Sequence, residues 1–262
     1  MTVTSEAVTS EAVKLPLITD VLGDAVRHST TVDLEGGLTA YVVQTPGDAL
    51  TVSTHYRIYD ALVPVTTQSF GADMTPYWAQ RSKEGYLERL AEFVLIGDRD
   101  GAFVGWTGHH RLRFDEQVII YLDSTGMVPQ RQSKGTMRKL MRQRIVDSVL
   151  PQCPDGVPVY LTARTESPIF YRLMLGLTDG GPVYPAPDTP LPPGVEQCGV
   201  DLAAWLGQRA ILEPGTLTLR NAYDALDELY GELPTTGNPQ LDAMFRGTLG
   251  PLDAFLVVAR MR

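Results

Sequence analysis

The chain has 262 residues, and its 44% hydrophobic and 20% charged content is that of an ordinary globular protein. A formal net charge of −9 argues against sequence-independent binding to nucleic acid, which requires a basic face. No stretch approaches the roughly 18 consecutive apolar residues of a membrane span, and the two cysteines and four histidines show no metal-ligand spacing. We therefore expect neither a nucleic-acid partner, nor a membrane, nor a metal site.

The first part of the chain reads as an extension that precedes the main domain. Residues 1–13 form a polar stretch that we expect to be disordered, and they lack the basic and apolar regions of a signal peptide. This favours a cytoplasmic protein. Within 14–54, apolar residues on one side predict a helix over 14–29, and a strand is predicted over 38–43 between two turns.

The segment 55–183 is expected to hold the main domain. Its first part, 55–70, has a mixed pattern, whereas 76–92 shows the periodicity of a helix. Two apolar runs within 93–106 flank an Asp100-Gly101 pair, which is a strong signal for a β-hairpin. Strand character continues from there to Phe114.

A strand, a helix and a second strand are predicted next. The strand covers 118–123, the helix 136–150 and the second strand 159–163. Because a helix connects the two strands, we expect them to be parallel through a right-handed crossover. Another helix is expected to begin at Glu166.

The last part of the chain, 184–262, contains a proline-rich connection, helical patterns and a final strand. The helical patterns lie near 199–212 and 217–232, and an apolar run predicts a strand over 253–259. Two polar helices and one strand cannot form a sheet of their own. We therefore expect this strand to return to the edge of the main sheet.

The segment from Met127 to Met137 carries the most informative pattern, because it joins a predicted strand to a predicted helix. A loop that opens a helix presents free backbone N–H groups, and the helix dipole adds partial positive charge, so the segment suits a phosphate. Gly135 allows close approach of an anion, and Lys134 and Arg131 add charge. Short glycine motifs are weak evidence, however, and an ordinary strand-to-helix turn explains the pattern as well.

This segment also resembles the acyl-CoA signature of the GNAT superfamily of N-acyltransferases, V-x-P-x-x-Q/R-x-x-G-x-G/A. The five signature places hold Met127, Pro129, Gln132, Gly135 and Met137. The methionines at the first and last places depart from the signature. The Eis-like aminoglycoside acetyltransferases accept a bulky residue at the last place, and the chain resembles this branch somewhat more closely. The resemblance covers roughly 55–177, and the strand order agrees with it.

The resemblance implies an α/β (α+β) fold of the GNAT type. The sheet would be mixed and mostly antiparallel, with a central splayed pair of parallel strands and helices on both faces. Acetyl-CoA, or another acyl-CoA, would lie in the gap between the splayed strands as co-substrate. The residues implied in binding it are Met127, Val128, Gln132, Ser133, Lys134, Gly135, Thr136, Met137 and Thr165.

Acyl transfer to an amine needs a base for the ammonium and an acid for the departing thiolate. Asp123 is the candidate base, because it ends an apolar strand where its pKa could be raised; capping of the next turn is an equally good interpretation. His109 and His110 point to opposite faces, so at most one reaches the gap, and His109 is kept as a candidate. The resemblance implies Tyr171 as the acid, although it also fits a core position. Tyr121 and Tyr160 are candidate walls for the substrate.

The sequence therefore predicts an acyltransferase that moves an acetyl or other short acyl group from acyl-CoA to a small-molecule amine. A homodimer is compatible with this prediction. Two alternatives stay open: a GNAT-fold protein with another acyl donor or another chemistry, such as aminoacyl transfer or decarboxylation, and a non-catalytic CoA-binding module. The departure at Met137 and the long C-terminal part favour the first alternative, and the lack of a clear Glu base favours the second.

Overall fold

The computed structural model describes residues 14–262 except 115, 133–134 and 231. The predicted tail over 1–13 and two of the predicted CoA-binding residues, Ser133 and Lys134, thus lie outside the described residues. The described residues form one ten-stranded sheet in the order β1-β2-β3-β4-β5-β6-β10-β9-β8, with β7 paired to β10. The strands are β1 Thr30–Leu34, β2 Leu38–Gln44, β3 Glu92–Gly97, β4 Phe103–Phe114, β5 Gln117–Met127, β6 Val159–Thr165, β7 Val183–Tyr184, β8 Leu212–Glu213, β9 Thr218–Leu219 and β10 Ala254–Arg260.

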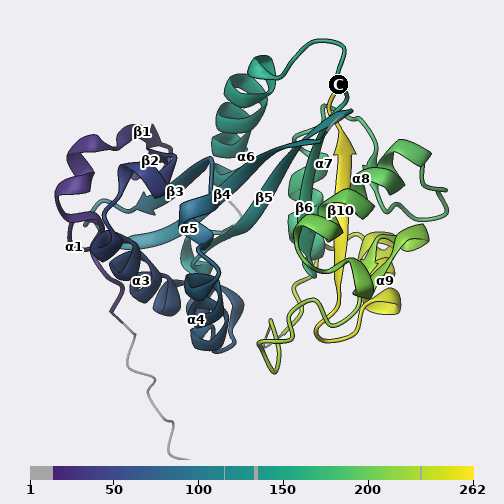
Figure 1. Ribbon diagram of the computed structural model, residues 1–262. Helices are drawn as coiled ribbons and strands as arrows, with labels where there is room; N and C mark the ends of the chain where they lie inside the picture. The colour runs from purple at the N-terminus through teal and green to yellow at the C-terminus, as the bar shows by residue number, and fades with distance from the viewer. Residues whose placement is uncertain (1–13, 115, 133–134, 231) are drawn as a thin grey trace, which may run out of the picture.

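Among these strands, β5 and β6 form the one parallel pair, and the other pairs are antiparallel. The predicted hairpin, the strand after it and the parallel partner over 159–163 are all present. In Figure 1, β5 and β6 lie close at one end and separate toward the other. The predicted mixed, mostly antiparallel sheet with a central splayed pair is confirmed.

Helices cover both faces of the sheet, as predicted, and two hydrophobic cores lie between the helices and the strands. The first core takes helical residues from α1, α3, α4, α5 and α8 together with Leu140 of α6, and the second takes them from α6, α7 and α9. Figure 1 shows α3 and α4 together beside one half of the sheet. The helices are α1 Ile18–Leu22, α2 Pro46–Ala49, α3 Val52–Phe70, α4 Thr75–Lys83, α5 Tyr86–Arg89, α6 Thr136–Met141, α7 Pro168–Leu175, α8 Pro193–Trp205 and α9 Pro239–Thr248.

The segment 55–70, whose sequence pattern is mixed, belongs to α3, the longest helix of the described residues. Ile58, Leu62 and Val65 are buried at spacings of four and three residues, which is the period of an amphipathic helix. Pro64 lies inside the helix and Thr51 caps its start, accepting a hydrogen bond from the Thr54 N–H. The internal proline, which usually ends a helix, obscured this period in the sequence.

Two predicted helices are shorter than expected because glycines with positive φ end them. The helix predicted over 14–29 ends at Gly23, at φ 56°, and continues as a 3₁₀ helix over Gly23–His28. The helix predicted over 76–92 divides at Gly85, at φ 64°, into α4 and α5. In contrast, α6 continues as a π-helical segment over Arg142–Val149, close to the predicted range.

The final strand joins the main sheet, as predicted, but the predicted place at the edge is wrong, because β9 and β8 lie beyond β10. β10 pairs antiparallel with β6 over Phe255–Arg260 and is buried over Ala254–Ala259. The helix predicted over 217–232 is wrong, because β9 and turns occupy this range and Leu217 and Asn221 have positive φ. The sequence pattern also missed α9, whose start is capped by the Asn238 side chain.

Candidate functional site

The parallel pairing of β5 and β6 ends halfway along β5. The last paired residues are Leu122 and Ala163. Beyond this point β5 continues to Met127 on β4 alone, while Arg164 and Thr165 of β6 pair with β10. The two strands therefore diverge, and the edge of β5 that faced β6 has no strand partner there among the described residues.

A β-bulge lies where the strands separate. Thr107 pairs with Thr125, but His109 pairs with Leu122, so Asp123 and Ser124 together lie opposite one residue of β4. Ser124 has a φ of 56°, and its Oγ accepts a hydrogen bond from the Trp106 indole at 2.9 Å. A bulge bends its strand and increases its twist, which accounts locally for the separation of β5 from β6.

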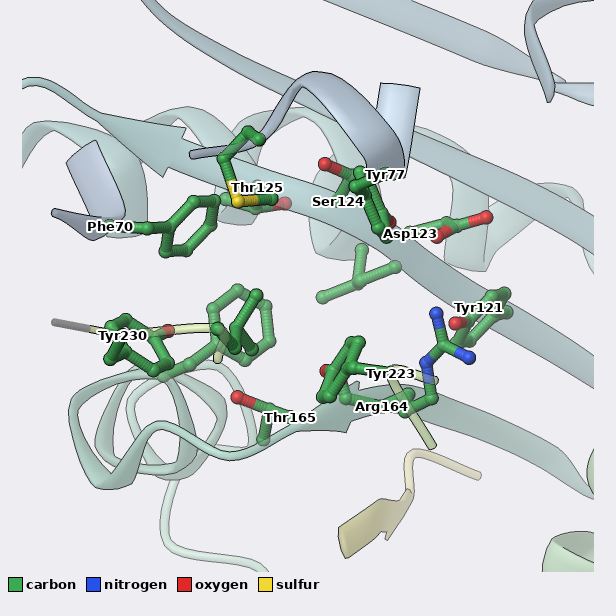
Figure 2. A pocket seen from close by; sticks show the side chains of 14 residues that line it. Phe70, Tyr77, Tyr121, Asp123, Ser124, Thr125, Arg164, Thr165, Tyr223 and Tyr230 are labelled. Atoms are coloured by element: carbon green, nitrogen blue, oxygen red, sulfur yellow. The ribbon is translucent and has the colours of Figure 1, made fainter. Parts of the chain in front are cut away.

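The opening between the diverging strands leads into a cavity of about 60 Å³. Figure 2 shows its walls, which come from β5, the end of β6, helices α3, α4 and α7, and the segment before α9. The lining side chains are mostly aromatic or polar: Phe70, Met74, Tyr77, Tyr121, Leu122, Asp123, Ser124, Thr125, Arg164, Thr165, Phe170, Tyr223, Leu229 and Tyr230.

Asp123 lines this cavity as a buried carboxylate with two partners. It forms an ion pair with Arg81 of α4, and its Oδ2 lies 3.0 Å from His110 Nε2. Burial by itself would raise the pKa of Asp123, but the charge of Arg81 and the His110 hydrogen bond hold it well below its usual range. The raised pKa predicted for Asp123 is therefore wrong. A carboxylate of such low basicity is a poor acceptor for the proton of an ammonium group.

The two histidines of β4 lie on opposite faces, as the strand alternation predicts. His110 is on the face of Asp123, and its Nδ1 lies 3.0 Å from the Arg89 carbonyl oxygen. His109 has Glu92 and Arg144 as electrostatic neighbours, and burial lowers its pKa to about 4. Neither histidine is among the residues that line the cavity. The candidate base His109 is thus a neutral imidazole away from the cavity wall.

Tyr171, the candidate acid, lies in the second hydrophobic core. Its hydroxyl donates a hydrogen bond to the Val183 carbonyl at 2.8 Å, and its ring packs edge-on against Phe245. Burial raises its pKa to about 12. It does not line the cavity, so the structure does not bring it together with Asp123 across the gap. Tyr160, a predicted wall residue, is also absent from the lining, whereas Tyr121 is present.

The predicted phosphate loop connects β5 to α6. Gly135 precedes the helix at φ 72°, and α6 begins at Thr136 without a side-chain cap. The backbone N–H groups of the first helical turn are thus left for another acceptor. Among the described residues, the nearest neighbour of a Cβ added to Gly135 would be Arg138 Nη2 at 4.0 Å, so the space beside Gly135 is open. The loop therefore fits an anion.

The other predicted CoA-binding residues take different positions. Met127 and Val128 are buried, and the Val128 N–H donates to Val104 at 2.9 Å. The exposed Gln132 donates from its side chain to the Met127 carbonyl at 2.6 Å. Met137 packs against both hydrophobic cores, so this departure from the GNAT signature fills the interior. Thr165 lines the cavity, and its hydroxyl accepts from the Ser167 N–H at 2.9 Å.

Three charged groups at this site did not stand out in the sequence. Arg81 lies within a predicted helix as one of several polar residues, and its role as partner of Asp123 depends on a contact over 42 residues. Arg164 directly follows the predicted strand 159–163, and an arginine at the end of a buried strand was a usable signal. Glu166 is buried, and its pKa is raised to about 8 by burial and by Asp253.

No protein-family model and no curated protein matches the sequence. GNAT N-acetyltransferases are among the solved structures that the chain resembles. The GNAT family N-acetyltransferase YhbS from Escherichia coli in complex with CoA is 14% identical, with a TM-score of 0.35 over 56% of this chain and 71% of that one. The spermidine N-acetyltransferase from Vibrio cholerae in complex with CoA and spermine is 13% identical, with a TM-score of 0.34 over 55% of this chain and 80% of that one.

An aminoglycoside acetyltransferase, HMB0005 from an uncultured soil metagenomic sample, is 16% identical, with a TM-score of 0.34 over 48% of this chain and 78% of that one. Likeness at this level assigns no activity to this chain, and the Eis-like branch stays a prediction. Among the described residues, no helix is long and apolar enough to cross a membrane.

Proposed function

We propose that the protein is an acyl-CoA-dependent N-acyltransferase of the GNAT superfamily, which transfers an acetyl or other short acyl group to the amine of a small molecule. The observation that supports this most directly is the divergence of β5 and β6 beyond Leu122 and Ala163. Three features support the proposal together: the unpaired edge of β5, the uncapped start of α6 after Gly135, and the cavity beside the bulge. An extended thioester needs such an arrangement: backbone partners for its amides, N–H donors for its phosphates, and a closed space for its reactive end.

In this proposal the donor lies along β5. Its pantetheine arm would run beside the strand edge beyond Leu122, and its pyrophosphate would accept hydrogen bonds from the N–H groups at the start of α6. Gly135 allows the phosphate to approach closely, because this residue has no Cβ. The thioester would then face the cavity near the bulge at Asp123 and Ser124.

The reaction itself is a direct attack. The nitrogen lone pair of the amine forms a bond to the thioester carbonyl carbon, the carbon–sulfur bond breaks, and the thiolate leaves as CoA. The amine loses one proton, and the thiolate takes up one. Because Asp123 is held by Arg81 and His110, we propose that it positions these side chains, and that the amine arrives neutral or loses its proton to water. Holding the two reactants together then supplies most of the rate enhancement.

A non-catalytic CoA-binding protein is the second candidate function. It is favoured by one observation, namely that Asp123, His109 and Tyr171 are each engaged elsewhere or remote from the cavity. Binding of CoA alone does not separate the two functions. Release of thiol that depends on an added amine does.

A charge exchange on the phosphate loop tests the donor site. Gly135→Asp and Gly135→Asn introduce side chains of the same shape that tolerate positive φ, so they differ in charge alone. We expect Gly135→Asp to weaken acetyl-CoA binding at least roughly tenfold more than Gly135→Asn, as measured by calorimetric titration. Equal affinities of the two variants for acetyl-CoA would show that the loop is not part of the CoA site, and they would contradict the proposal.

A further inference from the structure

The charged groups in and next to the cavity are more positive than negative, although the chain as a whole is acidic: Arg164 and Asp123 line the cavity, and Arg81 lies behind Asp123. Two guanidinium groups, Arg81 and Arg164, lie near the single lining carboxylate, Asp123. Arg81 forms the ion pair with Asp123, whereas Arg164 forms no ion pair with any described residue. Glu166, the next carboxyl along the chain, is largely protonated at pH 7 because its pKa is raised to about 8. The Arg164 charge is therefore left without a carboxylate of its own.

One nitrogen of the Arg164 guanidinium donates hydrogen bonds to described residues, and the other two nitrogens do not. Its Nη1 donates to Gln208 Oε1 at 2.9 Å and to the Ala222 carbonyl at 3.2 Å, and Tyr223 lies under the guanidinium at 4.7 Å. Its Nε and Nη2 donate to no described residue. Figure 2 shows the head group directed into the cavity beside Tyr121. An arginine presents five N–H donors in a fixed fork, so a second, planar acceptor can bind here.

Two phenol side chains line the cavity near Arg164. Tyr77 of α4 and Tyr121 of β5 both line it, and both are electrostatic neighbours of Arg164. Both residues are buried overall, and neither hydroxyl makes a hydrogen bond within the described part of the chain. Both hydroxyls are therefore free to donate to a ligand or a water molecule in the cavity.

We propose that the cavity binds a carboxylate of the substrate, with Arg164 as the counter-ion and the hydroxyls of Tyr77 and Tyr121 as additional donors. This inference rests on the proposed acyl transfer and names its substrate class. A guanidinium and a carboxylate are matched in shape and charge. About 10–15 Å³ of such space holds one water, so a cavity of about 60 Å³ admits a small head group and excludes a bulky one.

The carboxylate has two possible sources, and matched pairs of substrates distinguish them. Alanine and ethylamine differ by the carboxylate of the acceptor. Succinyl-CoA and butyryl-CoA differ in the terminal group of the acyl chain, which is a carboxylate in the first and a methyl in the second. Thiol release is measured for each pair as kcat/KM. We expect the carboxylate member of one pair to be preferred by roughly tenfold or more, and that pair identifies the source.

Three variants test whether the cavity causes this preference for a carboxylate. Arg164→Gln is expected to reduce the ratio within the preferred pair to near one, and Tyr121→Phe to reduce it several-fold while the ring is kept. Arg246→Gln removes an equal charge from the exposed face of α9 and is expected to leave the ratio unchanged. A ratio near one in the unaltered protein, or a ratio that survives Arg164→Gln, would overturn the inference.

A binding measurement separates this inference from the proposed function. Propionate, but not propionamide, is expected to raise the unfolding temperature of the unaltered protein, and Arg164→Gln is expected to abolish this rise. If propionate binds in this way but no acyl-CoA is consumed, the result supports the carboxylate site and contradicts the proposed acyl transfer. If acyl transfer is observed but propionate and propionamide act alike, the carboxylate site fails and acyl transfer stands.

Discussion

Each half of the molecule beside the cavity supplies an arginine, and the two arginines are held in opposite ways. Arg81, from helix α4 in the half that contains β1–β5, forms an ion pair with the buried carboxylate of Asp123. Arg164, from the half that contains β6 and β10, is tied to neutral oxygens of Gln208 and Ala222. A charge with a buried counter-ion fixes structure, whereas a charge without one is available to a ligand. The first half therefore shapes the site, and the second half supplies its binding charge.

The largest expected effect comes from removing the counter-ion of Arg81. Asp123→Asn leaves a buried guanidinium without a carboxylate, so we expect a loss of about 3–5 kcal/mol in the free energy of unfolding, measured with urea. Arg164→Gln breaks hydrogen bonds to neutral acceptors only, so the expected loss is about 1–2 kcal/mol. Similar losses in the two variants would show that the arginines are held alike.

The loss of folding stability in acid tests the same ion pair. Because the folded pKa of Asp123 lies below its unfolded value near 3.8, its contribution is present above that value and is lost as the pH falls further. Asp123→Asn lacks this contribution, so its stability is expected to change less than that of the unaltered protein below about pH 4.

A smaller effect is expected at Tyr171, which lies in the second half but away from the cavity. Tyr171→Phe removes the hydrogen bond to Val183 and keeps the ring against Phe245. We expect a loss of about 1 kcal/mol in stability and no loss of turnover. A fall in kcat of roughly 10²-fold with the fold intact would instead identify this hydroxyl as the acid for the thiolate.

The smallest effect is expected at Glu166, and it depends on pH. Its folded pKa, about 8, lies above the ordinary 4.5, so its contribution to stability is lost as the pH rises from about 4.5 through 8. Glu166→Gln removes this loss and is expected to raise the unfolding temperature at pH 9 by about 2–4 °C, with little change at pH 4. Glu232→Gln, on an exposed position, serves as the control. An unfolding temperature at pH 9 equal to that of the unaltered protein would contradict the raised pKa.

The sequence predicted the central strands better than the C-terminal part. β3, β4, β5, β6 and β10 consist of apolar runs bounded by turn residues, and such local patterns survive in the fold. The segment over 217–232 has a helical period in the sequence. In the structure its backbone is largely irregular, yet its leucines and Tyr223 are buried. Packing against β10 and α8 overrides the local preference there, and no local pattern reports such contacts.

Only some of the predicted site residues lie at the cavity, and their chemistry was not predicted. The resemblance implied the splayed pair and local sequence indicated the Gly135 loop, and Asp123 and Thr165 do line the cavity. The state of Asp123 depends on Arg81, which is 42 residues away in the sequence. The contacts of Arg164 with Gln208 and Ala222 span 44 and 58 residues. The pKa of a buried group depends on charged partners that are this far away in the sequence. Local sequence patterns do not report such partners, and the folded structure does.

Amine-dependent release of CoA thiol tests the central claim most directly. The purified protein is mixed with acetyl-CoA or succinyl-CoA and a panel of amines with and without carboxylates, and free thiol is followed in time. We expect thiol release that requires both the protein and an amine, with Gly135→Asp less active than Gly135→Asn. Tight binding of CoA with no amine-dependent thiol release from any donor would contradict it and would make the protein a CoA-binding module.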